Sequence, residues 1–380
     1  MRHHAWLLVL AYATACGDDD GGSTDTMDAG TLDSGTGVGD GGLSSDAAVA
    51  CSSEATQQGR VACAANAMLA TLTDTQKAGV AFALTDYATR SKWSNFPVQM
   101  NARAGMQMSA LSSSSQAAVL DLLRIALNTN GQNTAIGILR ADDYLASRAN
   151  GYGSGLYSVA VFGTPAATGD FEVMFGGHHM AYNLNFVGGN LYPVPQHLGA
   201  EPKGSFTLNG ASYDPLTAKG DAMFAIYSGL DTAQRTTAYL SGQTFNDTIA
   251  APSLDYNKGA SRTSKTVYPT GDNRKGVKVS DLSTTQQALV TTAIEQWARQ
   301  YPNELSDALM TAYTGAYADT LFAWAGSSSG PSKDAQNSYL RIDGPRVWIE
   351  LAVQGGIVIQ GETHYHTIYR DKTMDYGGQF

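Results

Sequence analysis

Two groups of short, strand-like runs lie far apart in the sequence, and they limit what this chain can fold into. Each run is rich in aromatic and β-branched residues and ends in Gly-Gly, Gly-Asn or Gly-Pro turns, a pattern typical of antiparallel hairpins. The first group covers about 157–194 and the second about 339–370. Apolar and polar residues alternate along 346–353, which predicts a half-buried sheet shared by both groups.

Helix-start signals occupy the rest of the chain. Four capping-box spacings precede helix-compatible runs. They are Thr73 with Gln76, Ser113 with Gln116, Asp231 with Gln234, and Ser283 with Gln286. They predict a mostly helical segment over about 60–150 and helical blocks near 216–242 and 283–324. We therefore expect an α+β fold, in which a helical N-terminal half packs against a mostly antiparallel sheet built from about 157–194 and 339–370.

The N-terminus resembles a bacterial lipoprotein signal. A short apolar run, too short to span a bilayer, ends in Ala13-Thr14-Ala15-Cys16, small residues before a cysteine. We expect residues 1–15 to be a signal peptide and Cys16 to be acylated, so that the membrane is a partner through this lipid anchor. The alternative is an ordinary signal peptide with a chance cysteine at the cleavage site.

The acidity of the chain is concentrated next to this signal. The net charge is −10, of which eight Asp in residues 17–46 contribute −8 and Arg2 contributes +1, so residues 47–380 carry only −3. The segment 16–50 is rich in Gly, Asp, Ser and Thr and predicts a disordered tether, followed by one domain over 51–380. Without a basic cluster, nucleic acid is not expected as a partner.

The two remaining cysteines, Cys51 and Cys63, stand close together at the start of the domain. An even pair in an exported protein predicts a disulfide bond, and the C-x₂-C spacing of zinc or redox sites is absent.

Histidine is the strongest chemical signal. Four of the five histidines after the signal lie in two clusters, His178-His179 and His364-x-His366, one in each strand group. The period of a strand places Glu362, His364 and His366 on one face, where imidazoles and a carboxylate suit a transition metal such as Zn, Cu or Fe. His178 and His179 point opposite ways if extended, so only one of them should ligate. The alternative is a polar strand surface without metal.

Other charged residues near these clusters are candidates for catalysis. Arg370 and Asp371 follow the second cluster, where Arg370 could bind an anion and Asp371 could orient an imidazole; the alternative is a salt bridge or turn at the strand end. Glu350 is a candidate general base. His197 is expected in a loop outside the site.

Several motifs together resemble one bacterial family, the domain of unknown function 3500, over about residues 64–378. They are Phe162-Gly-Thr-Pro165, Gly177-His-His179 with Asn183, Phe322-Ala-Trp-Ala-Gly-Ser327, Tyr339-Leu-Arg-Ile-Asp-Gly-Pro345 with Ile349-Glu350, and His364-Tyr-His-x₃-Arg370-Asp371. The resemblance implies that both histidine clusters and the Arg-Asp pair are family features, and it implies no reaction. Thr363, Tyr369 and His197 depart from the family's pattern.

These observations favour an extracytoplasmic lipoprotein of the bacterial envelope with a histidine-rich transition-metal site. If one coordination position of the metal stays open, we expect the site to catalyse a metal-dependent reaction on a small molecule. The alternative is a metal-free lipoprotein that binds a ligand or has a structural role in the envelope.

Overall fold

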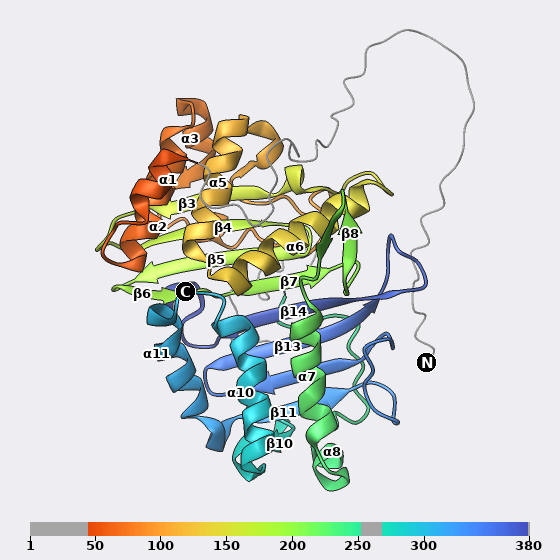
Figure 1. Cartoon of the computed structure of the whole chain (residues 1–380). Coiled ribbons are helices and arrows are strands. Elements are labelled where there is room, and N and C mark those ends of the chain that lie inside the picture. Colours follow the sequence, from red (N-terminus) through yellow and green to blue (C-terminus); the bar gives the residue numbers. More distant parts are fainter. Residues whose placement is uncertain (1–44, 252–267, 379–380) are drawn as a thin grey trace, which may run out of the picture.

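The computed structural model describes residues 45–251 and 268–378. These residues form ten α-helices around a large mixed sheet (Figure 1). The helices are α1 (Asp46–Cys51), α2 (Gln57–Ala70), α3 (Asp74–Val80), α4 (Tyr87–Arg90), α5 (Ser113–Ala126), α6 (Thr129–Ala146), α7 (Thr217–Gly229), α8 (Thr232–Ala238), α10 (Thr284–Ala298) and α11 (Asn303–Thr314).

The sheet has twelve strands and contains both strand groups expected from the sequence. Its central order is β1-β3-β4-β5-β7-β14-β13-β12-β11-β10, with β2 paired to β3 and β6 to β5. The strands are β1 (Ala81–Phe82), β2 (Met106–Gln107), β3 (Ser158–Gly163), β4 (Phe171–Gly177), β5 (Met180–Val187), β6 (Asn190–Tyr192), β7 (Gln196–Ala200), β10 (Val277–Lys278), β11 (Leu321–Ala325), β12 (Tyr339–Asp343), β13 (Val347–Gly355) and β14 (Thr363–Asp371). A separate hairpin joins β8 (Phe206–Leu208) to β9 (Ala211–Tyr213).

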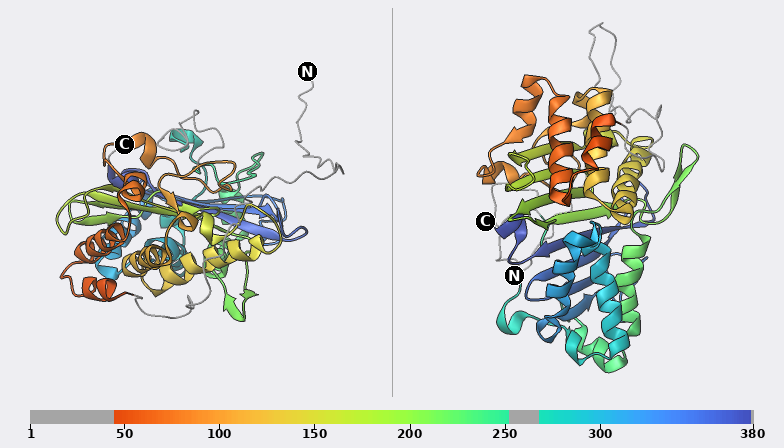
Figure 2. Two further views of the ribbon diagram at one scale, coloured as in Figure 1. Left: turned by 90° about the horizontal axis from the view of Figure 1, so that it is seen from above. Right: turned by 60° about the vertical axis from the view of Figure 1, so that its left-hand side comes forward.

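The expected α+β class and mostly antiparallel pairing are confirmed. Only β1 and β3 run parallel among the strand pairs of the described residues. The two groups are joined through β7, which pairs with β5 of the first group and with β14 of the second. The long helices cover one face of the sheet (Figures 1 and 2). Side chains of that face, such as Val173 and Leu184, pack with the helices in the main hydrophobic cluster.

The opposite face is also buried, so the expectation of a half-buried sheet is wrong. Along β13, Ile349 packs toward the helices, whereas Trp348 packs in a second cluster with Trp93 and Ala250. Irregular segments around Trp93 and Ala250 cover this second face in place of long helices. Of the polar residues in the alternating pattern, Glu350 therefore has no exposed surface, whereas Arg346 is half-buried.

Three of the four expected capping boxes are present, at Thr73, Asp231 and Ser283. The box at Ser113 is wrong, because Ser112 caps α5 by accepting the backbone N–H of Ser115. The expected helical block 283–324 also runs too far, because its last residues form β11 and pair with both β10 and β12.

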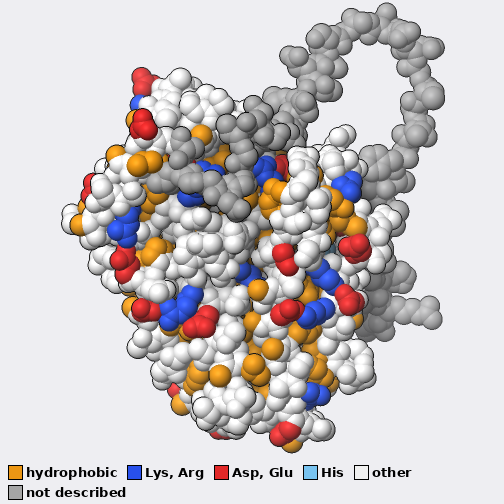
Figure 3. Space-filling model, in the orientation of Figure 1, with side chains coloured by type: hydrophobic (Ala, Val, Ile, Leu, Met, Phe, Trp, Pro, Cys, Tyr) orange, Lys and Arg blue, Asp and Glu red, His pale blue; other side chains and the backbone are white. Residues whose placement is uncertain are grey.

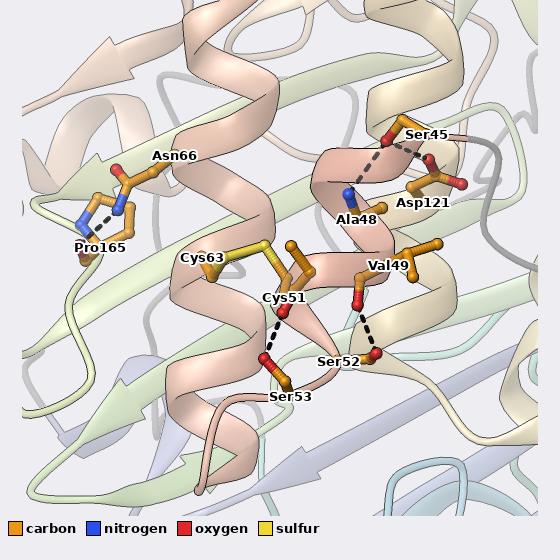
Figure 4. The surroundings of a disulfide bond; sticks show 11 residues. Ser45, Ala48, Val49, Cys51, Ser52, Ser53, Cys63, Asn66, Asp121 and Pro165 are labelled. Carbon is orange, nitrogen blue, oxygen red and sulfur yellow. Dashed lines mark hydrogen bonds between the residues drawn. A yellow bond between two sulfur atoms is a disulfide. The ribbon is translucent and has the colours of Figure 1, made fainter.

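The folded body begins earlier than the sequence indicated. Helix α1 begins inside the expected tether, and its cap Ser45 donates to Asp121 of α5. The expected disulfide between Cys51 and Cys63 joins α1 to α2 (Figure 4). The signal peptide, Cys16 and most of the tether lie outside the described residues.

Within 45–251 and 268–378, no helix is long and apolar enough to cross a membrane. On the face shown in Figure 3, acidic and basic side chains of the described residues are interspersed.

Candidate metal centre

Three buried histidines converge from two separate elements. His179 lies in the turn between β4 and β5, whereas His364 and His366 project from the same face of β14. One ring nitrogen from each lies within 4.8 Å of the others. The register explains this convergence, because β7 lies between β5 and β14 and pairs with both. The two sequence clusters are therefore brought into one site.

Gly199 of β7 makes room for these rings. It pairs with His366, and a Cβ atom placed on it would lie 3.1 Å from Cδ2 of His179 and 3.2 Å from Cδ2 of His366. The same Cβ would be 2.9 Å from the carbonyl oxygen of Tyr365. A larger residue would therefore push the imidazoles apart.

The spacing of the β14 histidines suits a shared ligand. Their Nε2 atoms are 3.2 Å apart. Two nitrogens bound to one tetrahedral Zn²⁺ at about 2.0–2.1 Å lie roughly 3.3 Å from each other. In the metal-free protein, the same distance permits a hydrogen bond between the two imidazoles.

Burial favours the neutral, ligating form of these imidazoles. Desolvation and the neighbouring histidines lower the pKa of His179 well below its ordinary value, and the same causes lower the pKa of His364 to about 2. Neutral imidazole offers a lone pair to a cation, whereas imidazolium does not. At neutral pH these two side chains are therefore ready to ligate without first releasing a proton.

The turn that carries His179 is fixed by backbone contacts. His179 has φ 62°, a conformation that histidine adopts more readily than most residues. Its N–H donates to the carbonyl oxygen of Asn95 at 3.1 Å, and its own carbonyl accepts the N–H of Gly199 at 2.6 Å. The side chain is therefore held above the sheet beside His366.

A carboxylate orients His366. Oδ1 of Asp247 lies 2.9 Å from Nδ1 of His366, and Nδ2 of Asn95 donates to Oδ2 of Asp247 at 3.3 Å. Burial acts to raise the pKa of Asp247, but the contact with His366 outweighs it and the pKa lies below its usual range. An ionised acceptor at Nδ1 places the proton there and leaves Nε2 of His366 facing the other two histidines.

His178 does not belong to the convergent group. Its Nδ1 lies 2.6 Å from Oδ1 of Asp142 on α6, and its ring stacks on His179 with centroids 3.7 Å apart. The ring of Tyr152 also lies beside His178, with the two centroids 5.0 Å apart. The expectation of opposite directions does not apply, because the pair forms a turn and not a strand. His178 therefore supports the ring of His179.

His197 was expected to lie in a loop outside the site, and the prediction of a loop is wrong. It belongs to β7, where its ring lies 5.3 Å from that of His366. Burial lowers its pKa to about 3, and its Nε2 is buried without a hydrogen-bond partner. It adjoins the three convergent histidines but is not one of them.

The family comparison covers this whole arrangement. The family described as "Protein of unknown function (DUF3500)" matches residues 54–378. The chain belongs to the DUF3500 family. No curated protein and no solved structure matches it significantly. All the site residues named above lie inside the matched range of this DUF3500 chain, and the family's description supplies no reaction.

Glu362, predicted as a ligand, is not part of the metal group. It lies in the turn before β14 and is exposed, so the strand alternation that was to align it with His364 starts only at the next residue. The three convergent side chains that could hold a metal in the described part of this DUF3500 chain are all imidazoles.

The predicted catalytic pair lies away from the histidines, at the far end of β14. Nε of Arg370 is 3.3 Å from Oδ2 of Asp375. Asp371 projects from the opposite face and accepts two hydrogen bonds from Arg346 and one from Tyr313. The prediction that Asp371 orients an imidazole is therefore wrong. The alternative, a salt bridge at the end of the strand, is correct, and its partner is Arg346.

Glu350, predicted as a general base, is occupied on both oxygens. It accepts the backbone N–H groups of Ile249 and Ala250 at 2.9 and 3.0 Å. Tyr339 and Trp348 also donate to it, at 2.6 and 2.9 Å. Burial raises its pKa. Glu350 therefore anchors the segment that carries Asp247 and does not face the site as a free base.

Sequence reasoning missed Asn95, Asp142 and Asp247. Each lies far along the chain from the histidine it serves and has no local motif that marks it.

Proposed function

We propose that this DUF3500 chain is a lipid-anchored, extracytoplasmic protein of the bacterial envelope that binds one transition-metal ion through His179, His364 and His366. The convergence of three buried imidazole nitrogens within 4.8 Å carries the proposal. Imidazole ligands suit Zn, Cu and Fe.

Three protein ligands leave room for a further ligand on a tetrahedral ion. A bound water or small molecule at that position would be polarised by the metal, which is the basis of metal-dependent hydrolytic catalysis. We therefore extend the proposal to catalysis on a small molecule, which requires that one coordination position of the metal is open.

Elemental analysis of the untagged full chain tests metal binding. We expect about one Zn, Cu or Fe per chain, and loss of this metal in the His364→Ala/His366→Ala variant. His197→Gln is the matched control, because it removes a neighbouring buried histidine outside the convergent group, and it should retain the metal. Wild-type protein that is isolated without metal and takes up none at neutral pH contradicts the proposal and favours the metal-free alternative.

The lipid anchor needs a separate test. Supporting it are the small residues before Cys16 and the acidic Gly/Asp segment that follows. Expressed with its own N-terminus in a bacterium, the wild-type chain should incorporate labelled palmitate and sediment with membranes. Cys16→Ser should do neither, and labelling of that variant would refute acylation at Cys16.

A further inference from the structure

Two carboxylates touch the histidine cluster without belonging to the convergent group. Asp247 contacts Nδ1 of His366 at 2.9 Å, and Asp142 contacts Nδ1 of His178 at 2.6 Å. They come from different parts of the chain, Asp142 from α6 and Asp247 from the irregular segment that covers the second face of the sheet. The stack of His178 on His179 connects the Asp142 contact to the proposed ligands.

The other hydrogen bonds of these carboxylates come from neutral groups. Asp142 accepts the backbone N–H of Gly153 at 2.8 Å, and Asp247 accepts that of Thr248 at 2.7 Å. In the described part of the chain, no ion pair joins either carboxylate to lysine or arginine. The neighbouring Arg103 donates instead to backbone carbonyl oxygens, including that of Gly177. Two negative charges therefore remain beside the histidines.

Three neutral imidazoles contribute no charge to a bound cation. A buried cation is costly unless opposite charges lie close to it. Two carboxylates balance the two positive charges of a divalent ion. Beside a monovalent ion they would leave one negative charge unbalanced.

We infer that the three-histidine site is matched to a divalent cation, and that Asp142 and Asp247 are the positioning residues that supply its counter-charge through His178 and His366. This inference rests on the proposed function, since it assigns the charge of the ion bound by those three histidines. It distinguishes Zn²⁺, Cu²⁺ or Fe²⁺ from Cu⁺.

Charge and orientation have different signatures. The Coulomb energy between a carboxylate and an ion is proportional to the charge of the ion. A lost counter-charge therefore lowers the logarithm of affinity twice as much for Zn²⁺ as for Cu⁺. A carboxylate that only orients a ring would, on removal, weaken both ions by a similar factor.

The test compares Zn²⁺ and Cu⁺ binding to the full chain by competition with chromophoric chelators, Cu⁺ being handled without oxygen. Asp142→Asn and Asp247→Asn retain the shape and an acceptor oxygen while removing the charge. Every sample carries Cys16→Ser, so that no free thiol binds Cu⁺, and binding by His364→Ala/His366→Ala is subtracted as background. Asp272→Asn, an exposed carboxylate, is the matched control.

Removal of one outer carboxylate partner of a metal ligand typically weakens metal binding 10- to 100-fold. We expect Asp247→Asn to weaken Zn²⁺ binding about 30-fold and Cu⁺ binding about fivefold. Asp142→Asn should have a smaller effect, because its partner His178 is not a ligand, but its loss for Zn²⁺ should again be twice that for Cu⁺ on a logarithmic scale. The double variant should multiply these effects, and Asp272→Asn should change neither affinity.

Equal losses for Zn²⁺ and Cu⁺, or no loss for either, would overturn this inference while leaving the three-histidine site intact. Wild-type protein that binds neither ion above the background would overturn the proposed function and the inference with it.

Discussion

Gly199 shows how one missing side chain creates the site. It is the residue of β7 that faces His366, and its Cα hydrogen occupies the place where any other residue would bring a Cβ against two imidazoles and the Tyr365 carbonyl. The contact with backbone cannot be relieved by rotating a side chain. The space between the histidine rings is therefore set by the choice of residue on a neighbouring strand.

We predict that Gly199→Ala weakens metal binding at least tenfold and destabilises the fold by about 1–3 kcal/mol, the usual cost of overpacking a filled interior. Calorimetric titration with Zn²⁺ and urea unfolding would measure the two effects. Gly204→Ala is the matched control, because a Cβ there meets nothing within 4 Å. Unchanged metal affinity in Gly199→Ala would show that the rings do not need this space.

Lys219 of α7 is a buried charge that serves no part of the site. Its ammonium group donates to Oγ1 of Thr134 at 3.0 Å, and burial lowers its pKa from 10.5 to about 7. Below pH 7 both folded and unfolded chains hold the proton, and the fold bears the full cost of burying it. Between pH 7 and 10.5 only the unfolded chain holds it, so stability rises with pH.

We predict that Lys219→Met is more stable than the wild type at pH 6.5, by about 2–4 kcal/mol, and that this advantage shrinks toward pH 10. Urea unfolding of both proteins at pH 6.5, 8 and 10 would show it. Lys278→Met, at an exposed lysine of β10, should leave the pH dependence unchanged. A constant difference between Lys219→Met and wild type would contradict the burial argument.

At the scale of elements, Glu350 connects β13 to the segment that carries Asp247. It accepts the N–H groups of Ile249 and Ala250, two and three residues after Asp247. In Glu350→Gln one of these donors would face an amide NH₂ group in place of an oxygen. We predict a loss of about 2 kcal/mol in stability, faster hydrogen exchange at Ile249 and Ala250, and weaker metal binding.

Hydrogen-exchange mass spectrometry and metal titration would test this connection. Glu362→Gln is the control, since that carboxylate lies near the start of β14 but is exposed. If Glu350→Gln is destabilised while metal affinity is unchanged, the segment does not need this anchor to place Asp247.

Local patterns predicted many elements but few of the contacts between them. Capping boxes and Gly-Gly turns depend on neighbouring residues, so Thr73, Asp231 and the β4–β5 hairpin could be read from the sequence. Strand β11 could not be predicted, because its apolar residues also suit a helix and only its pairing with β12 makes it a strand. The histidines could be named as one site, but their partners Asp142 and Asp247 depend on tertiary contacts without a local signal.

For the whole molecule, the site lies across the junction between the two strand groups. The ladder of β7 with β14 joins them, with the strands of the first group above it and those of the second below in Figure 1. His179 belongs to the first group, whereas His364 and His366 belong to the second. A metal ion bound by all three would therefore link the halves directly.

We predict that metal stabilises the folded chain as a unit. A ligand bound only to the folded state at 1,000 times its dissociation constant contributes about 4 kcal/mol. Urea unfolding with and without Zn²⁺ should show this gain, chelator should reverse it, and His179→Ala should remove most of it. His197→Gln should keep it. Because the ion would link both strand groups, metal should slow hydrogen exchange together in β14 and in β5, which directly follows His179. Protection confined to β14 would mean that His179 does not ligate.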